Sequence, residues 1–224
     1  MKRLSCVIFD IDGTLTQTNE LIFATFNYVT QKYTGKTYTP SEITAMFGPP
    51  EEIAIEKLVG KERNDDAIAD FYSFYESHHP AMAGAYEGIS DILDFLKKKG
   101  ILLAVFTGKG KRSALITLEK LHIKNYFDLI ITGSDVRLHK PSAEGIKSVM
   151  SRFGLEPDEV LMVGDAVADV KAAREAGVQI AAVLWDSYSK EKVMQMEVDY
   201  YFHDVKEFSD WIKLVLPMDG VNAH

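Results

Sequence analysis

The sequence predicts an α/β protein, because short apolar runs recur along the chain and segments with helical periodicity separate them. The runs are continuously apolar rather than alternating, which is typical of strands that helices cover on both faces of a parallel sheet. The expected strands are residues 4–9, 101–106, 128–132, 160–164, 179–184 and 198–202.

Helical periodicity is clearest in two segments between and after these strands. Such spacing places one apolar stripe along each helix, and Gly100 supplies a stop signal for the first of them. We expect both stripes to face the core; they consist of Ile89, Ile92, Leu93 and Leu96, and of Val205, Phe208, Ile212 and Val215.

Residues 16–80 interrupt the alternation, because helical patterns follow one another there without a strand. The patterns are the apolar repeat over 22–33 and the segments 39–43, 51–59 and 65–79. We therefore predict an all-helical cap at 16–83, inserted into an α/β core domain formed by 1–15 and 84–217. The links 15–18 and 80–88 are the expected hinges, and residues 218–224 are an expected C-terminal tail.

Composition excludes several classes of protein. The chain has 224 residues, of which 46% are hydrophobic and 26% charged, as in ordinary soluble globular proteins. Its single cysteine, Cys6, permits neither an internal disulfide nor a cysteine-based zinc site and fits a reducing cytoplasm. No segment approaches the roughly 18 apolar residues of a membrane span, and a formal charge of −8 argues against nucleic acid or anionic membrane as the partner.

Polar residues follow three of the expected strands. The stretch IFDIDGTL at 8–15 places Asp10 and Asp12 after the first apolar run, VFTGK ends the second run at Thr107, and VLMVGD ends another at Asp165. Ligands bind at the carboxyl ends of strands in open α/β sheets. These side chains are therefore expected to line one site.

The acidic residues in this set indicate a cation-binding site, because close carboxylates repel one another. Asp169 follows Asp165 by four residues across an expected helix start, so both carboxylates return to one face. Two like charges about 4 Å apart repel by roughly 4 kcal/mol at an effective dielectric near 20. Oxygen ligands favour Mg²⁺, and the candidate metal residues are Asp10, Asp12, Asp165 and Asp169.

Together these motifs resemble the haloacid dehalogenase superfamily of phosphatases. DIDGTL matches the first motif of that superfamily, Thr107 the second, Lys140 the third and GDAVAD at 164–169 the fourth, all in the right order. The DxDGTL letters alone would arise by chance in about one chain of this length in ten thousand. The resemblance implies a Rossmann-like parallel sheet with a small helical cap between motifs one and two, and Mg²⁺ as cofactor.

The resemblance also implies roles for the matching residues. Asp10 would attack phosphorus and form an aspartyl-phosphate. Asp12 would protonate the leaving oxygen and then activate the hydrolytic water, while its backbone carbonyl would bind Mg²⁺. Thr107 would hydrogen-bond the transferring phosphoryl group, and Lys140 would offset charge on it and on Asp10.

Further positions complete the expected site. The resemblance implies that Asp165 binds Mg²⁺ alongside Asp10, and that Asp169 contacts metal-bound water or orients Lys140. Gly108 and Lys109 follow Thr107 and are candidate substrate-binding residues. Lys109 or Arg112 would lie near an anionic substrate, and a solvated helix start over 108–112 is the alternative interpretation. Gly48, in an expected cap loop, is a candidate for specificity; a simple helix-to-helix turn is the alternative interpretation.

Features of the cap indicate the kind of phosphatase. The segments TQTNELI (16–22), MFGPPEE (46–52) and FYSFYESHH (71–79) look most like phosphoglycolate phosphatases and the related pyrophosphatases. Many relatives carry Asp-Ser just after the first motif, where this chain has Gln17 and Thr18, so the substrate stays open among phosphoglycolate, pyrophosphate, sugar phosphates and nucleotides. We expect a small anionic substrate that carries phosphate, and a monomer or weak dimer.

Three other functions compete with hydrolysis of a phosphate ester or of pyrophosphate. A β-phosphoglucomutase-like phosphomutase would use sugar-binding arginines in the cap, where residues 16–80 hold only Arg63. A dehalogenase needs no metal and generally lacks an aspartate equivalent to Asp12. A non-catalytic sensor of a phosphate ligand would not need the intact set of motif residues.

Overall fold

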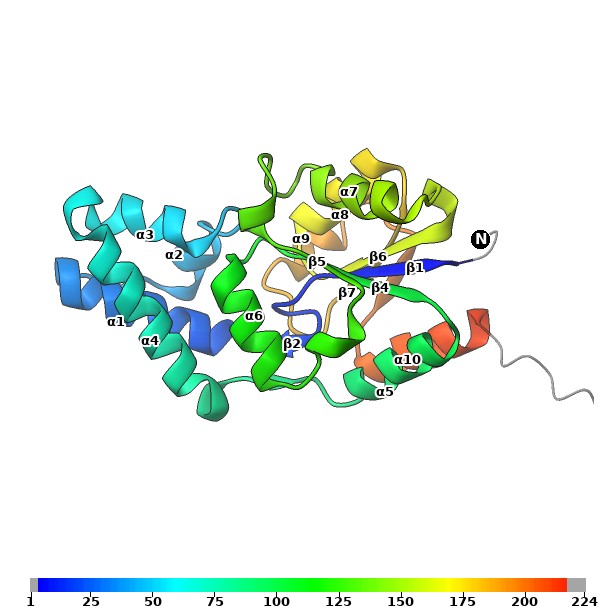
Figure 1. Ribbon diagram of the computed structural model, residues 1–224, viewed down its shortest axis with the longest axis horizontal. Coiled ribbons are helices and arrows are strands. Elements are labelled where there is room, and N and C mark those ends of the chain that lie inside the picture. Colours follow the sequence, from blue (N-terminus) through cyan, green and yellow to red (C-terminus); the bar gives the residue numbers. More distant parts are fainter. Residues whose placement is uncertain (1–3, 217–224) are drawn as a thin grey trace, which may run out of the picture.

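The computed structural model describes residues 4–216 and contains a six-stranded parallel sheet (Figure 1). The strands coincide with the six that the sequence predicts, most of them shorter at one or both ends. The α/β prediction is therefore confirmed. The strands are β1 (Cys6–Phe9), β4 (Leu102–Phe106), β5 (Leu129–Ile131), β6 (Val160–Gly164), β7 (Gln179–Val183) and β8 (Tyr200–Phe202).

Strand β1 lies in the middle of the sheet, whose order is β5-β4-β1-β6-β7-β8. It pairs in parallel with β4 on one side and with β6 on the other, so that Phe9 is aligned with Val105 and with Val163. The residues that follow these three strands therefore emerge at the same edge of the sheet.

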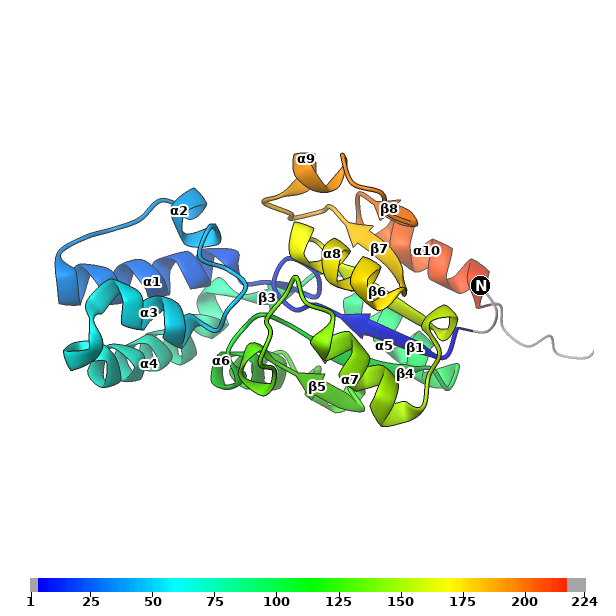
Figure 2. The ribbon, with the colours of Figure 1, turned by 90° about the horizontal axis from the view of Figure 1, so that it is seen from above.

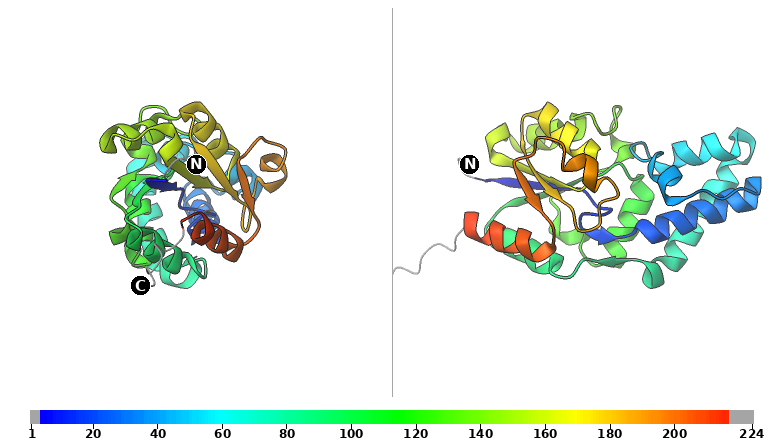
Figure 3. Two further views of the ribbon diagram at one scale, coloured as in Figure 1. Left: turned by 90° about the vertical axis from the view of Figure 1, so that its right-hand side faces the viewer. Right: turned by 180° about the vertical axis from the view of Figure 1, so that it is seen from behind.

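Helices cover both faces of the sheet, as Figure 3 shows from the end and from behind. On β1, Val7 and Phe9 belong to one hydrophobic cluster and Cys6 and Ile8 to the other, because successive side chains of a strand point to opposite faces. One face packs against α5 (Ile89–Lys98), α6 (Lys111–Lys120) and α10 (Val205–Val215), and the other against α7 (Glu144–Phe153), α8 (Val167–Ala176) and α9 (Lys190–Val193).

The two predicted apolar stripes face the core as expected. Ile89, Ile92, Leu93 and Leu96 of α5 are all buried. In α10, Phe208 and Ile212 are buried, while the two valines at its ends pack against the same cluster from partly buried positions. Asp204 caps α10 by accepting a hydrogen bond from the backbone N–H of Glu207.

The cap is a group of helices beyond the carboxyl ends of the strands (Figure 2). It has a hydrophobic core of its own, in which Tyr75 is the largest fully buried side chain. Thr39 begins the second helix with a capping box closed by Glu42, and Pro40 stands at its first position. The helices are α1 (Asn19–Thr34), α2 (Pro40–Thr44), α3 (Glu51–Val59) and α4 (Asn64–Met82).

Short elements complete the described residues. A two-stranded antiparallel pair, β2 (Thr16–Gln17) and β3 (Gly84–Ala85), joins the two segments that lead into and out of the cap. The sequence did not predict this pair, because two residues are too few to show a period. Helix α4 also runs through Pro80 to Met82, so the second expected hinge begins later than Pro80. Single 3₁₀ turns span Lys61–Arg63, Lys124–Tyr126, Gly133–Asp135 and Pro157–Glu159.

The C-terminal tail, the domain boundaries, the location and the oligomeric state are not tested by the fold. The predicted tail at 218–224 falls outside the described residues. The domain boundaries at 15/16 and 83/84, the cytoplasmic location and the monomer or weak dimer stay predictions. Among residues 4–216, no helix has both the length and the apolar character needed to cross a bilayer.

A close contact between helix and sheet gives a prediction about stability. A Cβ on Gly145 of α7 would lie 2.2 Å from a ring carbon of Phe106 on β4. We expect Gly145→Ala to lower the free energy of unfolding by about 1–3 kcal/mol, despite the roughly 1 kcal/mol that alanine gains in helix propensity. Urea unfolding measures this, with Gly84→Ala as control, because nothing lies within 4 Å of a Cβ there. Equal stability of the two variants would contradict the prediction.

Candidate active site

Three neighbouring strands deliver the central side chains of the site. Asp10 directly follows β1, Thr107 follows β4 and Asp165 follows β6. The backbone N–H of Asp10 donates to the carbonyl of Val163 at 2.9 Å, and that of Thr107 donates to Ile131 at 3.1 Å. The parallel register therefore holds the three residues side by side, as the sequence predicted for residues at strand ends.

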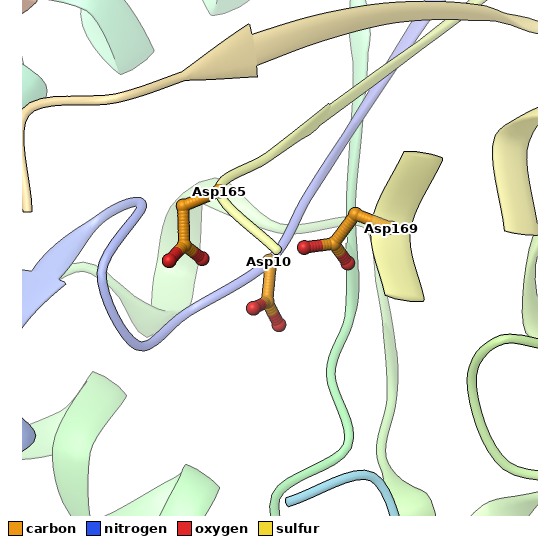
Figure 4. Close-up of side chains that lie close together, drawn as sticks. All are labelled: Asp10, Asp165 and Asp169. Carbon is orange, nitrogen blue, oxygen red and sulfur yellow. The ribbon is translucent and has the colours of Figure 1, made fainter. Parts of the chain in front are cut away.

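Asp10, Asp165 and Asp169 form a buried acidic cluster (Figure 4). One carboxylate oxygen from each lies within 4.8 Å of the others. Asp169 comes from the first turn of α8, which begins two residues after Asp165. The clustering that was inferred from the four-residue spacing is thus present in the structure.

Lys140 lies against two of these carboxylates. Its Nζ is 3.0 Å from Asp10 Oδ1 and 2.6 Å from Asp169 Oδ1, and the lysine is 7% exposed. Burial disfavours the ammonium form, but the neighbouring carboxylates of Asp10 and Asp169 outweigh this and raise the pKa of Lys140. The lysine is therefore a fixed positive charge inside the acidic cluster.

Burial and mutual repulsion act on the aspartates in the opposite way. Burial, with further contributions from Asp169 and Asp12, raises the pKa of Asp10 to about 6, although Lys140 lowers it. Burial together with the charges of Asp169 and Asp10 raises the pKa of Asp165 well above its usual range. One lysine thus does not compensate the negative charge of the cluster.

The residues present fit a hard divalent cation. Every candidate donor is a carboxylate oxygen, and three carboxylates share the single ammonium group of Lys140. Both oxygens of Asp169 are engaged, because Oδ1 meets Lys140 and Oδ2 accepts from the backbone N–H of Ala166 at 3.0 Å. Asp10 and Asp165 are therefore better placed than Asp169 to bind a metal directly.

Asp12 belongs to a second arrangement on the cap side. Lys109 Nζ lies 3.1 Å from both of its carboxylate oxygens, and Thr18 Oγ1 donates to Asp12 Oδ1 at 2.5 Å. The Lys109 ammonium also lies 4.8 Å from the centre of the Tyr75 ring of α4. Burial opposes the ammonium form, but Asp12 and Tyr75 outweigh it and raise the pKa of Lys109.

Sequence reasoning missed the contact between Thr18 and Asp12. The only signal was that Thr18 lies in the segment where the chain departs from its relatives. It also missed Ser187, whose hydroxyl donates to the backbone carbonyl of Asp165 at 2.6 Å from the loop after β7. No motif contains this serine.

The cap loop before α3 lies directly on the loop that follows Thr107. A Cβ on Gly108 would lie 2.8 Å from the carbonyl oxygen of Gly48, and one on Gly133 would lie 2.9 Å from the ring of Pro50. Only glycine allows the backbones to approach this closely. Gly48 itself has φ +125°, a conformation that other residues rarely adopt.

A cavity of about 500 Å³ lies beneath this cap loop. Its lining includes all of the residues that the sequence indicates as catalytic, metal-binding or substrate-binding, except Arg112. Arg112 does not line it; the guanidinium lies 4.5 Å from the ring centre of Tyr72 on α4. The site residues in the lining are Asp10, Asp12, Gly48, Thr107, Gly108, Lys109, Lys140, Asp165 and Asp169.

Glu51, at the start of α3, joins the cap to the core. Its carboxylate accepts hydrogen bonds from the backbone N–H of Gly110, at 2.7 Å, and from the hydroxyl of Ser113. These groups belong to the N-terminus of α6, where a helix favours negative charge. Burial nevertheless raises the pKa of Glu51, against the opposing influence of Lys109.

A family model described as haloacid dehalogenase-like hydrolase matches residues 7–183, which is most of the chain. The chain belongs to this family. A pyrophosphatase PpaX from Anoxybacillus flavithermus is 31% identical over 205 residues, covering 92% of this chain and 95% of that protein. The family resemblance seen in the sequence is therefore confirmed.

Solved structures show the same fold. The structure described as a "putative beta-phosphoglucomutase" from Thermotoga maritima is 27% identical with a TM-score of 0.75, covering 95% of this chain and 100% of that one. That of a "predicted phosphoglycolate phosphatase" from Haemophilus somnus reaches a TM-score of 0.84 at 21% identity, covering 96% and 99%. At that identity the second likeness shows the fold alone.

The contacts of Glu51 give a prediction about the cap. Glu51→Ala leaves a buried N–H without its acceptor, and we expect it to lower the free energy of unfolding by about 1–3 kcal/mol. Glu51→Gln keeps an acceptor for Gly110 and is the matched control. Urea unfolding of both variants at pH 7 measures the difference.

The raised pKa of Glu51 adds a pH dependence with a defined sign. A group whose pKa is higher in the folded state contributes stability below its unfolded pKa and loses that contribution as pH rises through the folded value. The glutamine variant does not titrate, so its stability relative to the wild type should increase from pH 4 to pH 8. A difference that decreases over this range would contradict the assignment.

Proposed function

We propose that the protein is a Mg²⁺-dependent phosphohydrolase that acts through an aspartyl-phosphate on Asp10. The observation that carries this proposal is the position of Asp10 at the end of β1, in contact with Lys140 and beside the carboxylates of Asp165 and Asp169, at the floor of a cavity that the cap covers. The site joins a nucleophile, a fixed cation and oxygen ligands. Membership of a hydrolase family supports the same chemistry.

Asp10 is the nucleophile in this mechanism. Lys140 keeps a positive charge beside it, which favours the ionised carboxylate and later offsets negative charge on the phosphoryl group. Asp169 holds Lys140 in place through the 2.6 Å contact. Thr107 lines the cavity next to Asp10 and is positioned to hydrogen-bond a phosphoryl oxygen.

Asp12 is the acid and base. It donates a proton to the leaving oxygen as the bond from that oxygen to phosphorus breaks and the bond from Asp10 to phosphorus forms. It then takes a proton from the water that hydrolyses the aspartyl-phosphate. Lys109 and Thr18 hold its carboxylate on the cap side of Asp10, where a leaving group would lie.

Asp10 and Asp165 would hold Mg²⁺, with the backbone carbonyl of Asp12 as a further ligand. When bound, the ion supplies charge that balances the carboxylates and polarises the phosphoryl group. The excess of clustered carboxylates over the one ammonium group of Lys140 supports this assignment.

We propose a small phosphate monoester as the substrate, in the manner of a phosphoglycolate phosphatase. Inorganic pyrophosphate is the second candidate, because curated relatives at 29–31% identity carry the name pyrophosphatase PpaX. A phosphomutase has less support: Arg63 donates to the backbone carbonyl of Tyr33 and does not line the cavity.

Replacing the nucleophile tests whether the protein is an enzyme or a sensor. We expect Asp10→Asn to lower kcat by about 10⁴-fold or more, since the covalent step requires the carboxylate. Steady-state assays with p-nitrophenyl phosphate and Mg²⁺ measure this, and Asp91→Asn, at an exposed position of α5, is the control. Retention of wild-type turnover by the Asp10 variant would exclude the aspartyl-phosphate.

Metal dependence and substrate class are tested together. With excess Mg²⁺ we expect the protein to hydrolyse at least one compound of a panel that consists of phosphoglycolate, sugar phosphates, p-nitrophenyl phosphate and pyrophosphate. A chelator should abolish this hydrolysis. Mg²⁺ at a hundred times its Kd should also raise the free energy of unfolding by about 2.7 kcal/mol. Activity that survives chelation, or unchanged stability with Mg²⁺, would contradict the metal assignment.

A further inference from the structure

Most of the cap residues that line the cavity are apolar; the polar ones are Asn19, Ser41, Thr44 and Glu51. The cap side of the lining comes from α1, α2, α3 and α4 and from the loop after α2, and its apolar part is called the cap wall. Phe26 and Phe71 pack edge to face with ring centres 5.4 Å apart and are 3% and 2% exposed, whereas Phe47 is 44% exposed. The wall consists of Ile22, Phe26, Met46, Phe47, Ala54 and Phe71.

The cap adds no positive charge to the cavity. Among the described residues that line it, none from the cap is lysine, arginine or histidine, and Glu51 adds a carboxylate. Lys109 and Lys140 come from the core and are already paired with Asp12 and with Asp10 and Asp169.

The remaining cation of the described lining, Lys192, lies on α9 and is exposed. Water therefore competes for any anion that it would hold. A charged leaving group, such as the second phosphoryl group of pyrophosphate or the carboxylate of phosphoglycolate, would lose hydration against the apolar wall, and the neutral polar side chains of the described lining would not supply an opposing charge.

We infer, resting on the phosphohydrolase function proposed above, that the preferred substrates are phosphate monoesters of apolar alcohols, with the alkyl or aryl group seated against the cap wall. The reaction yields the free alcohol and inorganic phosphate. Asp12 gives its proton to the oxygen of the leaving alcohol and regains a proton from the water that hydrolyses the aspartyl-phosphate, so no co-reactant besides water is needed. Within the phosphate monoesters proposed above, this preference places alkyl and aryl esters ahead of phosphoglycolate, and it differs from the pyrophosphate named for the curated relatives.

A series of n-alkyl phosphates tests the inference, because ethyl, butyl and hexyl phosphate have leaving groups of similar reactivity and differ in apolar length. Each methylene removed from water should raise kcat/KM by up to about fourfold. Hexyl phosphate should therefore exceed ethyl phosphate at least about tenfold, and should exceed both pyrophosphate and phosphoglycolate. All assays contain Mg²⁺.

A matched pair of variants locates the effect. Met46→Gln makes the cap wall more polar at similar side-chain size, and should reduce the ratio of kcat/KM for hexyl over ethyl phosphate at least about threefold. Met194→Gln makes the same change on an exposed side chain that does not line the cavity, and should keep the wild-type ratio.

Each outcome is decisive. The preference for an apolar leaving group is overturned if kcat/KM does not rise with alkyl length, or if pyrophosphate or phosphoglycolate is hydrolysed faster than hexyl phosphate. In that case the proposed function still stands, provided that turnover depends on Mg²⁺ and on Asp10. A rising series with equal ratios in both methionine variants also overturns the role of the cap wall. Absence of turnover of every compound, including p-nitrophenyl phosphate, overturns both proposals.

Discussion

The site depends on one buried ammonium group among carboxylates. Lys140 contacts Asp10 and Asp169, and Asp165 lies in the same cluster. Removing these charges from water is costly, and the pairing recovers the cost only where the geometry is close and hydrogen-bonded. Three carboxylates against one ammonium still leave an excess of negative charge, which is the electrostatic reason for expecting a divalent cation there.

The two aspartates of the first motif pair with different lysines. Asp10 faces Lys140 in the core, and Asp12 faces Lys109 on the cap side. The Lys109 ammonium also rests on the ring of Tyr75, a cap residue whose hydroxyl hydrogen-bonds Thr117 of α6. The placement of Asp12, the proposed acid and base, is thus linked to the docking of the cap.

That docking relies on close backbone contact. Gly108 and Gly133 leave room for the cap loop at Gly48 and Pro50, and Glu51 fastens the start of α3 to the N-terminus of α6. The same arrangement presents an apolar wall to the cavity. The docking of the cap therefore decides which side chains face the buried carboxylates across the cavity.

Periodicity and strand-end residues determined much of the structure in advance. Continuous apolar runs predicted the six strands, because a strand covered on both faces needs apolar side chains on both. The order of the motifs placed Asp10, Thr107 and Asp165 at one edge, because parallel strands end together. These are local patterns, and the sequence alone displays them.

Only the tertiary structure decided which side chains meet across long separations. Thr18 reaches Asp12, Ser187 reaches the carbonyl of Asp165, and Arg112 turns to Tyr72 rather than to the cavity. The β2–β3 pair likewise forms because the two ends of the cap segment meet. Contacts of this kind follow from how helices and loops pack against one another, and no spacing within a single segment encodes them.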